Sequence, residues 1–272
     1  MSSATHQADA ITLSILQAMK ARGEKITCLT SYDASFTRLL ERQGVEVLLV
    51  GDSLGMVIQG HDTTRSVSMD DMVYHCEQVS RVREKSYLIA DMSFNSYADS
   101  SSAVLNAQRL INEAGADMVK LEGGAAQLEN VRALTQQGIP VCGHLGLLPQ
   151  SVESADGFRV QGRDETTAQK IIDDAMALQA AGAGLLVLEC VPANLGKKLS
   201  DVVNIPVIGI GAGVDCDGQV LVIYDAIGLT TGKRPRFVRD FLSATCSLDE
   251  AITDFVKQVK SGEFPSHEES YE

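Results

Sequence analysis

Short apolar segments recur along the whole of this chain, and helix-forming segments separate them. Eight of these runs are predicted strands, at residues 25–33, 45–53, 86–94, 116–123, 139–146, 184–191, 205–213 and 219–228. Several of the amphipathic segments between them end in glycine, the residue best suited to the left-handed cap of a helix. Nearly continuous apolar strands are typical of parallel sheets covered on both faces, and eight βα units close a barrel. The pattern predicts an α/β fold, a single (β/α)8 TIM barrel with an N-terminal helix.

The length of the chain agrees with one such barrel. It has 272 residues, and a (β/α)8 barrel typically takes about 250. No low-complexity stretch or long linker divides the sequence, so we expect residues 1–272 to form one domain. Flexible tails are expected at residues 1–9 and 264–272. The long polar loop at residues 146–163 is a candidate lid.

Charge and composition argue against several classes of partner. A formal net charge of −13 at pH 7 disfavours a broad nucleic-acid surface, which needs clustered Lys and Arg. No apolar run reaches the roughly 18 residues that a membrane span requires, and the first ten residues do not resemble a signal peptide. The six cysteines are scattered singly, as buried thiols of a reducing compartment would be. We therefore expect a cytoplasmic protein whose partners are small molecules and copies of itself, with no nucleic acid and no membrane.

Five of the predicted strands end in ionisable side chains. These residues are Asp52, Asp91, Lys120 with Glu122, His144 and Glu189. Because successive strand residues point to opposite faces, Lys120 and Glu122 share one face of their strand while Val119 and Leu121 share the other. The apolar pair is expected to lie under the helices, so the charged pair would face the barrel axis. The sequence thus gathers ionisable groups at the carboxyl end of the barrel, where enzymes of this fold carry their active sites.

Three of these residues, Asp52, Asp91 and Glu122, are carboxylates from different strands. Hard oxygen ligands suit Mg²⁺ better than Zn²⁺, and a metal there would act as a Lewis acid on an oxygen-bearing substrate. Each residue alone has a structural alternative. An aspartate after a strand often forms a turn or caps a helix. Lys120 and Glu122 could be a structural ion pair, and His144 could be a hydrogen-bonded core residue.

With these residues identified, the chain closely resembles the ketopantoate hydroxymethyltransferase family. The resemblance runs from about Ile26 to Phe237, through LTSYD, VGDSLGMV, ADMSFNSY, AGADMVKLEGG, GIPVCGHLGLLPQS, VQG, VLECVP, IPVIGIGAG and DGQVLV. It implies a Mg²⁺-dependent transferase that adds a one-carbon unit from 5,10-methylenetetrahydrofolate to 3-methyl-2-oxobutanoate. The product would be 2-dehydropantoate (ketopantoate), in pantothenate and coenzyme A biosynthesis. The resemblance also implies a homo-oligomer, commonly a decamer.

The resemblance assigns roles to single residues of this chain. Asp52 and Asp91 match the principal metal positions, which also contact substrate, and Glu122 matches an additional carboxylate of the metal site. The remaining matches are Ser53 and Lys120 as substrate contacts, Glu189 as the catalytic proton acceptor and His144 as an active-site neighbour. A metal-stabilised enolate, formed when Glu189 takes the C3 proton, would then attack the one-carbon unit of the folate.

The chain departs from the usual family pattern in a few places. Ser93 and Asn95 replace residues of an ADMPFGSY-like motif, Leu148 replaces a usual Thr, and residues 155–158 replace a more Gly-rich loop. None of these changes removes a proposed ligand or base. They concern the folate pocket and the loop rather than the reaction.

Two rival interpretations remain on sequence grounds. One is another Mg²⁺-dependent barrel enzyme acting on 2-oxoacids, a relative of isocitrate lyase or phosphoenolpyruvate mutase. The Cys142-Gly143-His144 segment matches the lyase motif only superficially, because it lies inside a strand pattern without the preceding Lys pair, and Cys142 is expected to be a core residue. The other is a non-catalytic barrel kept as a binding or assembly protein; loss of a carboxylate or of Lys120 would have favoured it, but all of these residues are present. The GIGAG segment at 209–213 is either a tight turn or a phosphate site made of backbone N–H groups.

Overall fold

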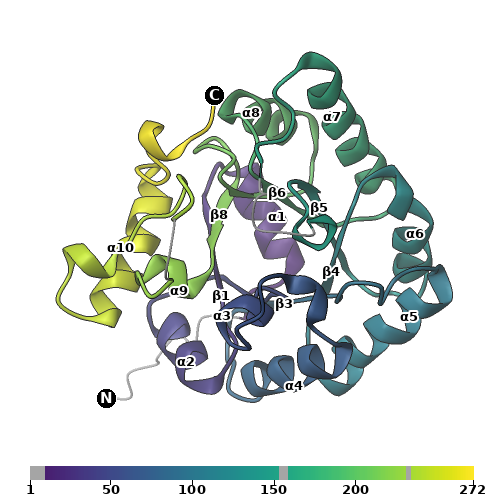
Figure 1. Ribbon diagram of the computed structural model, residues 1–272, viewed down its shortest axis with the longest axis horizontal. Coiled ribbons are helices and arrows are strands. Elements are labelled where there is room, and N and C mark those ends of the chain that lie inside the picture. Colours follow the sequence, from purple (N-terminus) through teal and green to yellow (C-terminus); the bar gives the residue numbers. More distant parts are fainter. Residues whose placement is uncertain (1–9, 153–158, 231–233) are drawn as a thin grey trace, which may run out of the picture.

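The structure is a computed structural model that describes residues 10–152, 159–230 and 234–272, and it forms a closed barrel of parallel strands (Figure 1). Strand order around the barrel follows the sequence, from β1 to β8, and β8 pairs with β1. The strands are β1 (Ile26–Thr30), β2 (Val47–Val50), β3 (Tyr87–Asp91), β4 (Met118–Glu122), β5 (Val141–Gly146), β6 (Leu185–Glu189), β7 (Val207–Ile210) and β8 (Gly218–Leu221). The predicted (β/α)8 barrel is confirmed.

Helices surround the barrel on its outer side, as Figure 1 shows. The longer ones are α2 (Ala34–Arg42), α4 (Met69–Ser80), α5 (Ser100–Gln108), α6 (Leu128–Gln136), α7 (Glu165–Ala180), α8 (Ala193–Val202) and α10 (Leu248–Ser261). Shorter helical turns are α3 (Leu54–Val57), α9 (Ile223–Ala226), the π-turn η2 (Arg109–Glu113) and the 3₁₀ turns η1 (Thr64–Ser66), η3 (Ala125–Gln127), η4 (Pro149–Ser151), η6 (Leu242–Ala244) and η7 (His267–Glu269). None of the described helices is long and apolar enough to cross a membrane.

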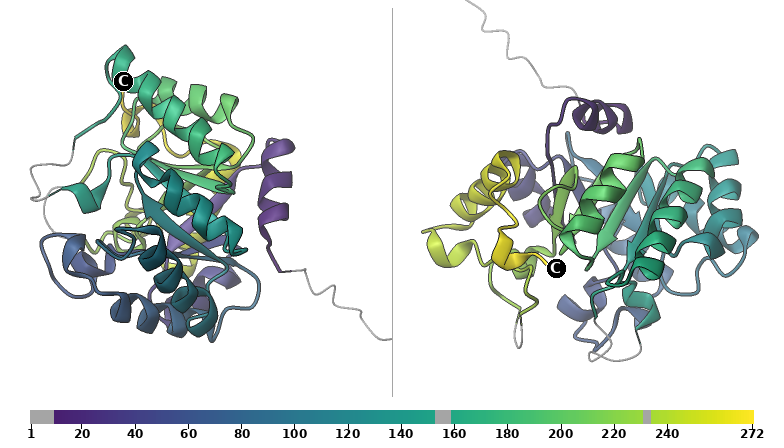
Figure 2. Two further views of the ribbon diagram at one scale, coloured as in Figure 1. Left: turned by 90° about the vertical axis from the view of Figure 1, so that its right-hand side faces the viewer. Right: turned by 90° about the horizontal axis from the view of Figure 1, so that it is seen from above.

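The N-terminal helix α1 (Leu13–Ala21) lies outside this ring, at the amino end of the barrel (Figure 2). Its hydroxyl N-cap, Thr12, accepts a hydrogen bond from the backbone of Ile15, which starts the helix. Leu16 and Met19 are buried and belong to the same apolar cluster as the inward-facing residues of the strands, such as Ile26. The helix therefore covers the amino end of the barrel, opposite the end at which the strands terminate.

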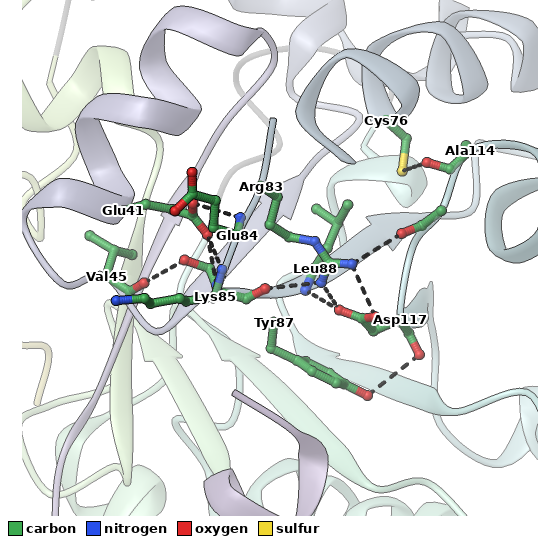
Figure 3. Close-up of polar contacts among 12 residues, drawn as sticks. Glu41, Val45, Cys76, Arg83, Glu84, Lys85, Tyr87, Leu88, Ala114 and Asp117 are labelled. Atoms are coloured by element: carbon green, nitrogen blue, oxygen red, sulfur yellow. Dashed lines mark hydrogen bonds and ion pairs between the residues drawn. The ribbon is translucent and has the colours of Figure 1, made fainter. Parts of the chain in front are cut away.

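Polar contacts at the amino end hold the start of β3 against its neighbours (Figure 3). The Glu41 carboxylate accepts hydrogen bonds of 2.8 Å from the backbone N–H groups of Glu84, Lys85 and Ser86. On the other side, Asp117 accepts from the Leu88 backbone at 2.8 Å and forms an ion pair with Arg83. Because these bonds join β3 to the chain before β4, they support the register that brings the far ends of the two strands together.

The C-terminal segment is packed against the barrel, which corrects the expectation of a flexible tail at residues 264–272. Phe264 is only 2% exposed, and its ring centroid lies 5.3 Å from that of Phe241. Tyr271 forms a parallel bridge with Pro192 and accepts a 2.8 Å hydrogen bond from the Ala193 backbone at the start of α8. The segment is polar and acidic in composition, but Phe264 and Tyr271, near its two ends, pack against the apolar core. Residues 1–9 lie outside the described part of the chain.

Candidate active site

Strand ends bring the ionisable residues predicted from sequence to the carboxyl end of the barrel. Asp91, Glu122 and Glu189 are the last residues of β3, β4 and β6, and Asp52 follows β2 by two positions. Parallel pairing sets Asp91 beside Lys120. The same pairing sets Glu122 beside His144. Residues paired in this way on adjacent strands point to the same face of the sheet, so these ionisable side chains lie together as the sequence predicts.

These side chains are buried despite their charge. Asp52, Lys120 and Glu122 are only 4%, 4% and 5% exposed. Asp91 and His144 are 3% and 2% exposed. Buried charges are costly unless they are paired or bind a ligand. The group contains more carboxylates than cations, so it is suited to receive a further positive charge.

Lys120 and His144 connect the carboxylates into one network. The Lys120 Nζ lies 3.1 Å from Asp91 Oδ1 and 3.2 Å from His144 Nδ1. The His144 Nδ1 also lies 3.4 Å from Glu122 Oε1, and its Nε2 lies 3.2 Å from Glu189 Oε2. A continuous set of contacts therefore links β3, β4, β5 and β6 across the carboxyl end of the barrel.

Burial and mutual charge shift the pKa values in this network. Burial, together with the Asp91 and Glu122 carboxylates, raises the pKa of Asp52 to about 8. Burial also raises the pKa of Asp91, against the opposing effect of Lys120. Burial and the Lys120 ammonium lower the pKa of His144, but its contacts with Glu122 and Glu189 outweigh them and raise it overall. Carboxylates bind a metal in the ionised form, so a bound cation would favour the ionised state that burial and mutual repulsion disfavour here.

The donor set fits Mg²⁺ held by few protein ligands. Among the described residues, Asp91 Oδ1 and Glu122 Oε1 are buried oxygens with no hydrogen-bond partner, although Asp91 Oδ1 lies beside Lys120 outside hydrogen-bond geometry. No three His, Cys, Asp or Glu side chains of the described residues converge as ligands of one ion. Mg²⁺ commonly takes one or two carboxylates, with waters and substrate oxygens as its other ligands. Asp52 and Asp91, joined by a 3.0 Å hydrogen bond from the Asp52 backbone to Asp91 Oδ2, fit that description.

Ser53 lies at the rim of this network. Its side chain is partly exposed, and its hydroxyl is 2.8 Å from the phenol oxygen of Tyr32. Tyr32 is 1% exposed and belongs to the same apolar cluster as Leu54, the first residue of α3. The hydroxyl therefore has a fixed position beside Asp52, where it can contact a bound substrate.

The backbone around Glu189 is unusually constrained. Cys190, the next residue, has a φ of 49°, a left-handed conformation that costs free energy in a residue other than glycine. Gly146, at the end of the neighbouring strand, has a φ of 89°, and a Cβ there would lie 2.1 Å from the Glu189 carbonyl oxygen. Only glycine permits this close approach of β5 to β6. Strain of this kind often marks residues whose position matters for function.

Two site residues escaped the sequence analysis, Gln150 and Tyr97. Gln150 lies in η4, 3% exposed, and donates a 2.8 Å hydrogen bond to Asp52 Oδ2. Tyr97 lies beyond β3 and donates a hydrogen bond to the Gln150 side chain. Both residues border a cavity of about 230 Å³ that also reaches Glu122. Gln150 and Tyr97 lie in the segments LPQS and FNSY, and neither carries a charge that would distinguish it in the sequence. Residues 153–158, in the middle of the candidate lid, lie outside the described part of the chain.

Comparison with known proteins agrees with this geometry. The family model described as ketopantoate hydroxymethyltransferase matches residues 10–267. The chain belongs to that family. It is therefore an enzyme of the transferase class, and the non-catalytic interpretation is not supported.

Relatives named 3-methyl-2-oxobutanoate hydroxymethyltransferase match this chain along almost their whole length. The 3-methyl-2-oxobutanoate hydroxymethyltransferase of Nitrosococcus oceani is 59% identical over 261 residues, which are 96% of this chain and 99% of that protein. The protein of the same name from Methylobacillus flagellatus is 54% identical over 262 residues, 96% of this chain and 100% of the relative.

Solved structures of other enzymes share the fold. A phosphonopyruvate hydrolase in complex with oxalate and Mg²⁺ superposes with a TM-score of 0.60 at 14% identity, over 92% of this chain and 97% of the hydrolase. A phosphonomutase-like protein from Burkholderia cenocepacia gives a TM-score of 0.63 at 15% identity, over 79% of this chain and 94% of the other. At these sequence identities the similarity shows only that the proteins share a barrel fold. It gives no support to the rival interpretation that this chain has a mutase or lyase activity.

Proposed function

We propose that this protein transfers a hydroxymethyl group to 3-methyl-2-oxobutanoate, with 5,10-methylenetetrahydrofolate as the one-carbon donor and Mg²⁺ as the metal, in pantothenate and coenzyme A biosynthesis. The observation that carries the proposal is the buried network of Lys120, His144 and Glu189 beside the Asp52 and Asp91 carboxylates, in a member of this family. Such a network offers a base and a cation next to a site for a hard metal.

Asp52 and Asp91 would hold the metal, and Glu122 would support the site from β4. When bound, Mg²⁺ supplies a Lewis acid that favours the enolate of a 2-oxoacid. Glu122 has one oxygen engaged by the Gln150 backbone at 3.0 Å, and its other oxygen faces His144. Its role would therefore be to contribute negative charge beside the metal.

Glu189 is the proposed base that takes the C3 proton of the substrate. Its side chain is 13% exposed, whereas the side chain of His144 beside it is 3% exposed, so Glu189 is the more accessible of the two. The His144 ring, 3.2 Å away, limits where the carboxylate can point. A base must lie within hydrogen-bond reach of the proton that it removes, and a residue at the mouth of the barrel can meet that condition.

Lys120 is the proposed partner of the negative charge on the substrate. Burial lowers the pKa of its ammonium, but the surrounding carboxylates of Asp91, Glu122 and Asp52 raise it above the ordinary value for lysine. The group therefore stays charged and can offset the substrate carboxylate or the developing enolate. Carbon C3 then forms a bond to the one-carbon unit as the bond from that unit to one folate nitrogen breaks. Water displaces the second folate nitrogen and supplies the hydroxyl group, and the two nitrogens take up the proton lost from C3 and the proton lost from water.

We also propose that the protein works in the cytoplasm as a homo-oligomer, in line with its family. Large apolar side chains remain exposed on several outer helices, among them Tyr74 on α4 and Leu105 on α5, 61% and 63% exposed. Light scattering after size-exclusion chromatography measures the subunit number. An elution as monomer at micromolar concentration would contradict the assembly.

The decisive experiment follows the C3 proton of 3-methyl-2-oxobutanoate by NMR in D₂O. The protein with Mg²⁺ should exchange the proton, EDTA should stop the exchange, and methylenetetrahydrofolate should then give ketopantoate. Glu189→Gln should abolish exchange while substrate binding is nearly unchanged. The matched control is Glu129→Gln, since Glu129 is an exposed residue of α6. Undiminished exchange in Glu189→Gln would refute the assignment of the base, and no exchange or product in the metal-loaded parent protein would refute the function.

A further inference from the structure

Gln150 has hydrogen bonds at both ends of its side-chain amide and at its backbone. The amide Nε2 donates to Asp52 Oδ2 at 2.8 Å and to the carbonyl oxygen of Met92 at 2.9 Å. The amide oxygen accepts a hydrogen bond from the hydroxyl of Tyr97. The backbone N–H donates to Glu122 Oε2 at 3.0 Å. A residue from the turn after β5 is thereby bonded to the carboxylates that follow β2 and end β4.

The direction of these bonds fixes the orientation of the amide. The Tyr97 oxygen accepts the backbone N–H of Glu122 at 3.3 Å, so its own hydrogen is free to point at the Gln150 oxygen. With its oxygen so engaged, the amide can present only N–H groups to Asp52. A polarised series of bonds therefore runs from the Glu122 backbone through Tyr97 and Gln150 to the Asp52 carboxylate.

We propose that Gln150 is a positioning residue for the metal site, which holds the Asp52 and Glu122 carboxylates in the orientation that receives Mg²⁺. The proposal rests on the proposed function. By binding Oδ2, the amide leaves Asp52 Oδ1 as the oxygen available to the metal. The Gln150 backbone binds Glu122 Oε2, so Glu122 Oε1 faces His144 and the rest of the network. This oxygen is buried and has no hydrogen-bond partner among the described residues.

Hydrogen bonds to metal-ligating groups commonly change metal affinity by about 10- to 100-fold when they are removed. A residue that only filled space in the loop would not have this effect, since the carboxylates would keep their orientation without it. Metal affinity therefore separates a positioning role from a purely structural one. Activity alone would not, because both roles predict a loss.

The test uses Gln150→Met, which keeps the length and apolar stem of the side chain but has no amide. Mn²⁺, which prefers the same octahedral oxygen ligands as Mg²⁺, is titrated into the full-length protein, and the free ion is counted by electron paramagnetic resonance. We expect the Kd for Mn²⁺ to rise at least about tenfold, and the rate of C3 proton exchange to recover in part as Mg²⁺ is raised. The matched control is Gln136→Met, because Gln136 is exposed at the end of α6.

An unchanged Kd in a folded Gln150→Met protein would overturn the proposal, even if activity fell. If circular dichroism shows that this variant does not fold, Tyr97→Phe takes its place, since it removes the hydroxyl that orients the amide while the ring is kept. The same rise in Kd would then support the proposal, and an unchanged Kd would overturn it. A parent protein that binds Mn²⁺ but neither exchanges the proton nor forms product would instead refute the proposed function, and this result is distinct from either outcome for the variants.

Discussion

Removal of the Lys120 charge should destabilise the metal-free protein in a pH-dependent manner. The Lys120 Nζ is buried 3.1 Å from Asp91 Oδ1, and Lys120→Met leaves the neighbouring carboxylates without this cation. Because the folded-state pKa of Lys120 is raised above its ordinary value, its stabilising contribution is complete throughout the neutral range. That contribution is lost only above the ordinary pKa of lysine, so any pH dependence of the variant near neutrality must come from the carboxylates and from His144, whose pKa is also raised.

The size of the effect follows from burial. Breaking a buried ion pair by removing one partner typically costs about 3–5 kcal/mol, which corresponds to a fall in melting temperature of roughly 10 °C for a chain of this size. The loss should be smaller at acid pH. The pKa of Asp52 is raised to about 8 and that of Asp91 is also raised, so these two carboxylates take up protons more readily as pH falls, and fewer uncompensated charges remain. Mg²⁺ should restore part of the loss at alkaline pH by replacing the missing charge.

Thermal unfolding followed by circular dichroism tests this reasoning. Melting temperatures of both proteins are compared at about pH 6 and about pH 8.5, in EDTA and in Mg²⁺. The control is Lys197→Met, because Lys197 pairs with Asp201 on the surface of α8 and its side chain is 56% exposed. Surface pairs contribute little, so this variant should melt close to the parent protein. A fall for Lys120→Met as small as that of the control, or equal falls at both pH values, would refute the electrostatic account.

Three further predictions concern the same end of the barrel. Gly146→Ala should lower kcat at least about tenfold, because the new Cβ would clash with the Glu189 carbonyl oxygen. The control is Gly138→Ala, since Gly138 also has a positive φ, 74°, but no atom lies within 4 Å of the new Cβ. This variant should lose stability and keep its kcat. Deletion of Tyr271 and Glu272 should lower kcat severalfold, because the bridge between Tyr271 and Pro192, which follows β6, is lost. Deletion of Glu272 alone is the control. Equal kcat values for the two truncated proteins would contradict a role of the Tyr271 bridge in holding the loop after β6. Because burial raises the pKa of Asp52 to about 8, Mg²⁺ binding should release a proton at about pH 7 and little at about pH 9, which calorimetry in buffers of different ionisation enthalpy measures.

The barrel could be predicted because its signal is local and repeated. Each strand is an apolar run, each helix has its own periodicity, and closure follows from their number. Strand ends were less certain. The predicted eighth strand, 219–228, ends in the structure at Leu221, and its remainder forms the short helix α9 from Ile223. An apolar run alone does not distinguish a strand from a buried helical turn, so the sequence could not locate this boundary.

The positions of the strand-end residues could also be predicted, because the carboxyl ends of parallel strands meet at one face whatever the details of packing. Their partners could not. Glu122 is predicted to belong to the metal site, but the sequence could not show that its two oxygens would face His144 and the Gln150 backbone. Which oxygen points where depends on contacts between residues far apart in the chain.

Gln150 illustrates why the remainder of the site needed a structure. Its sequence separation from Asp52 is 98 residues, and it carries neither charge nor a metal-ligating group that would attract notice. An uncharged amide in a polar loop is usually exposed, and only the fold shows that this one is 3% exposed between two carboxylates. Ionisable residues at strand ends indicate which chemistry a barrel can perform. The neutral donors that orient them come from loops, where the sequence pattern has no period, and so the geometry of the site depends on the part of the chain that sequence constrains least.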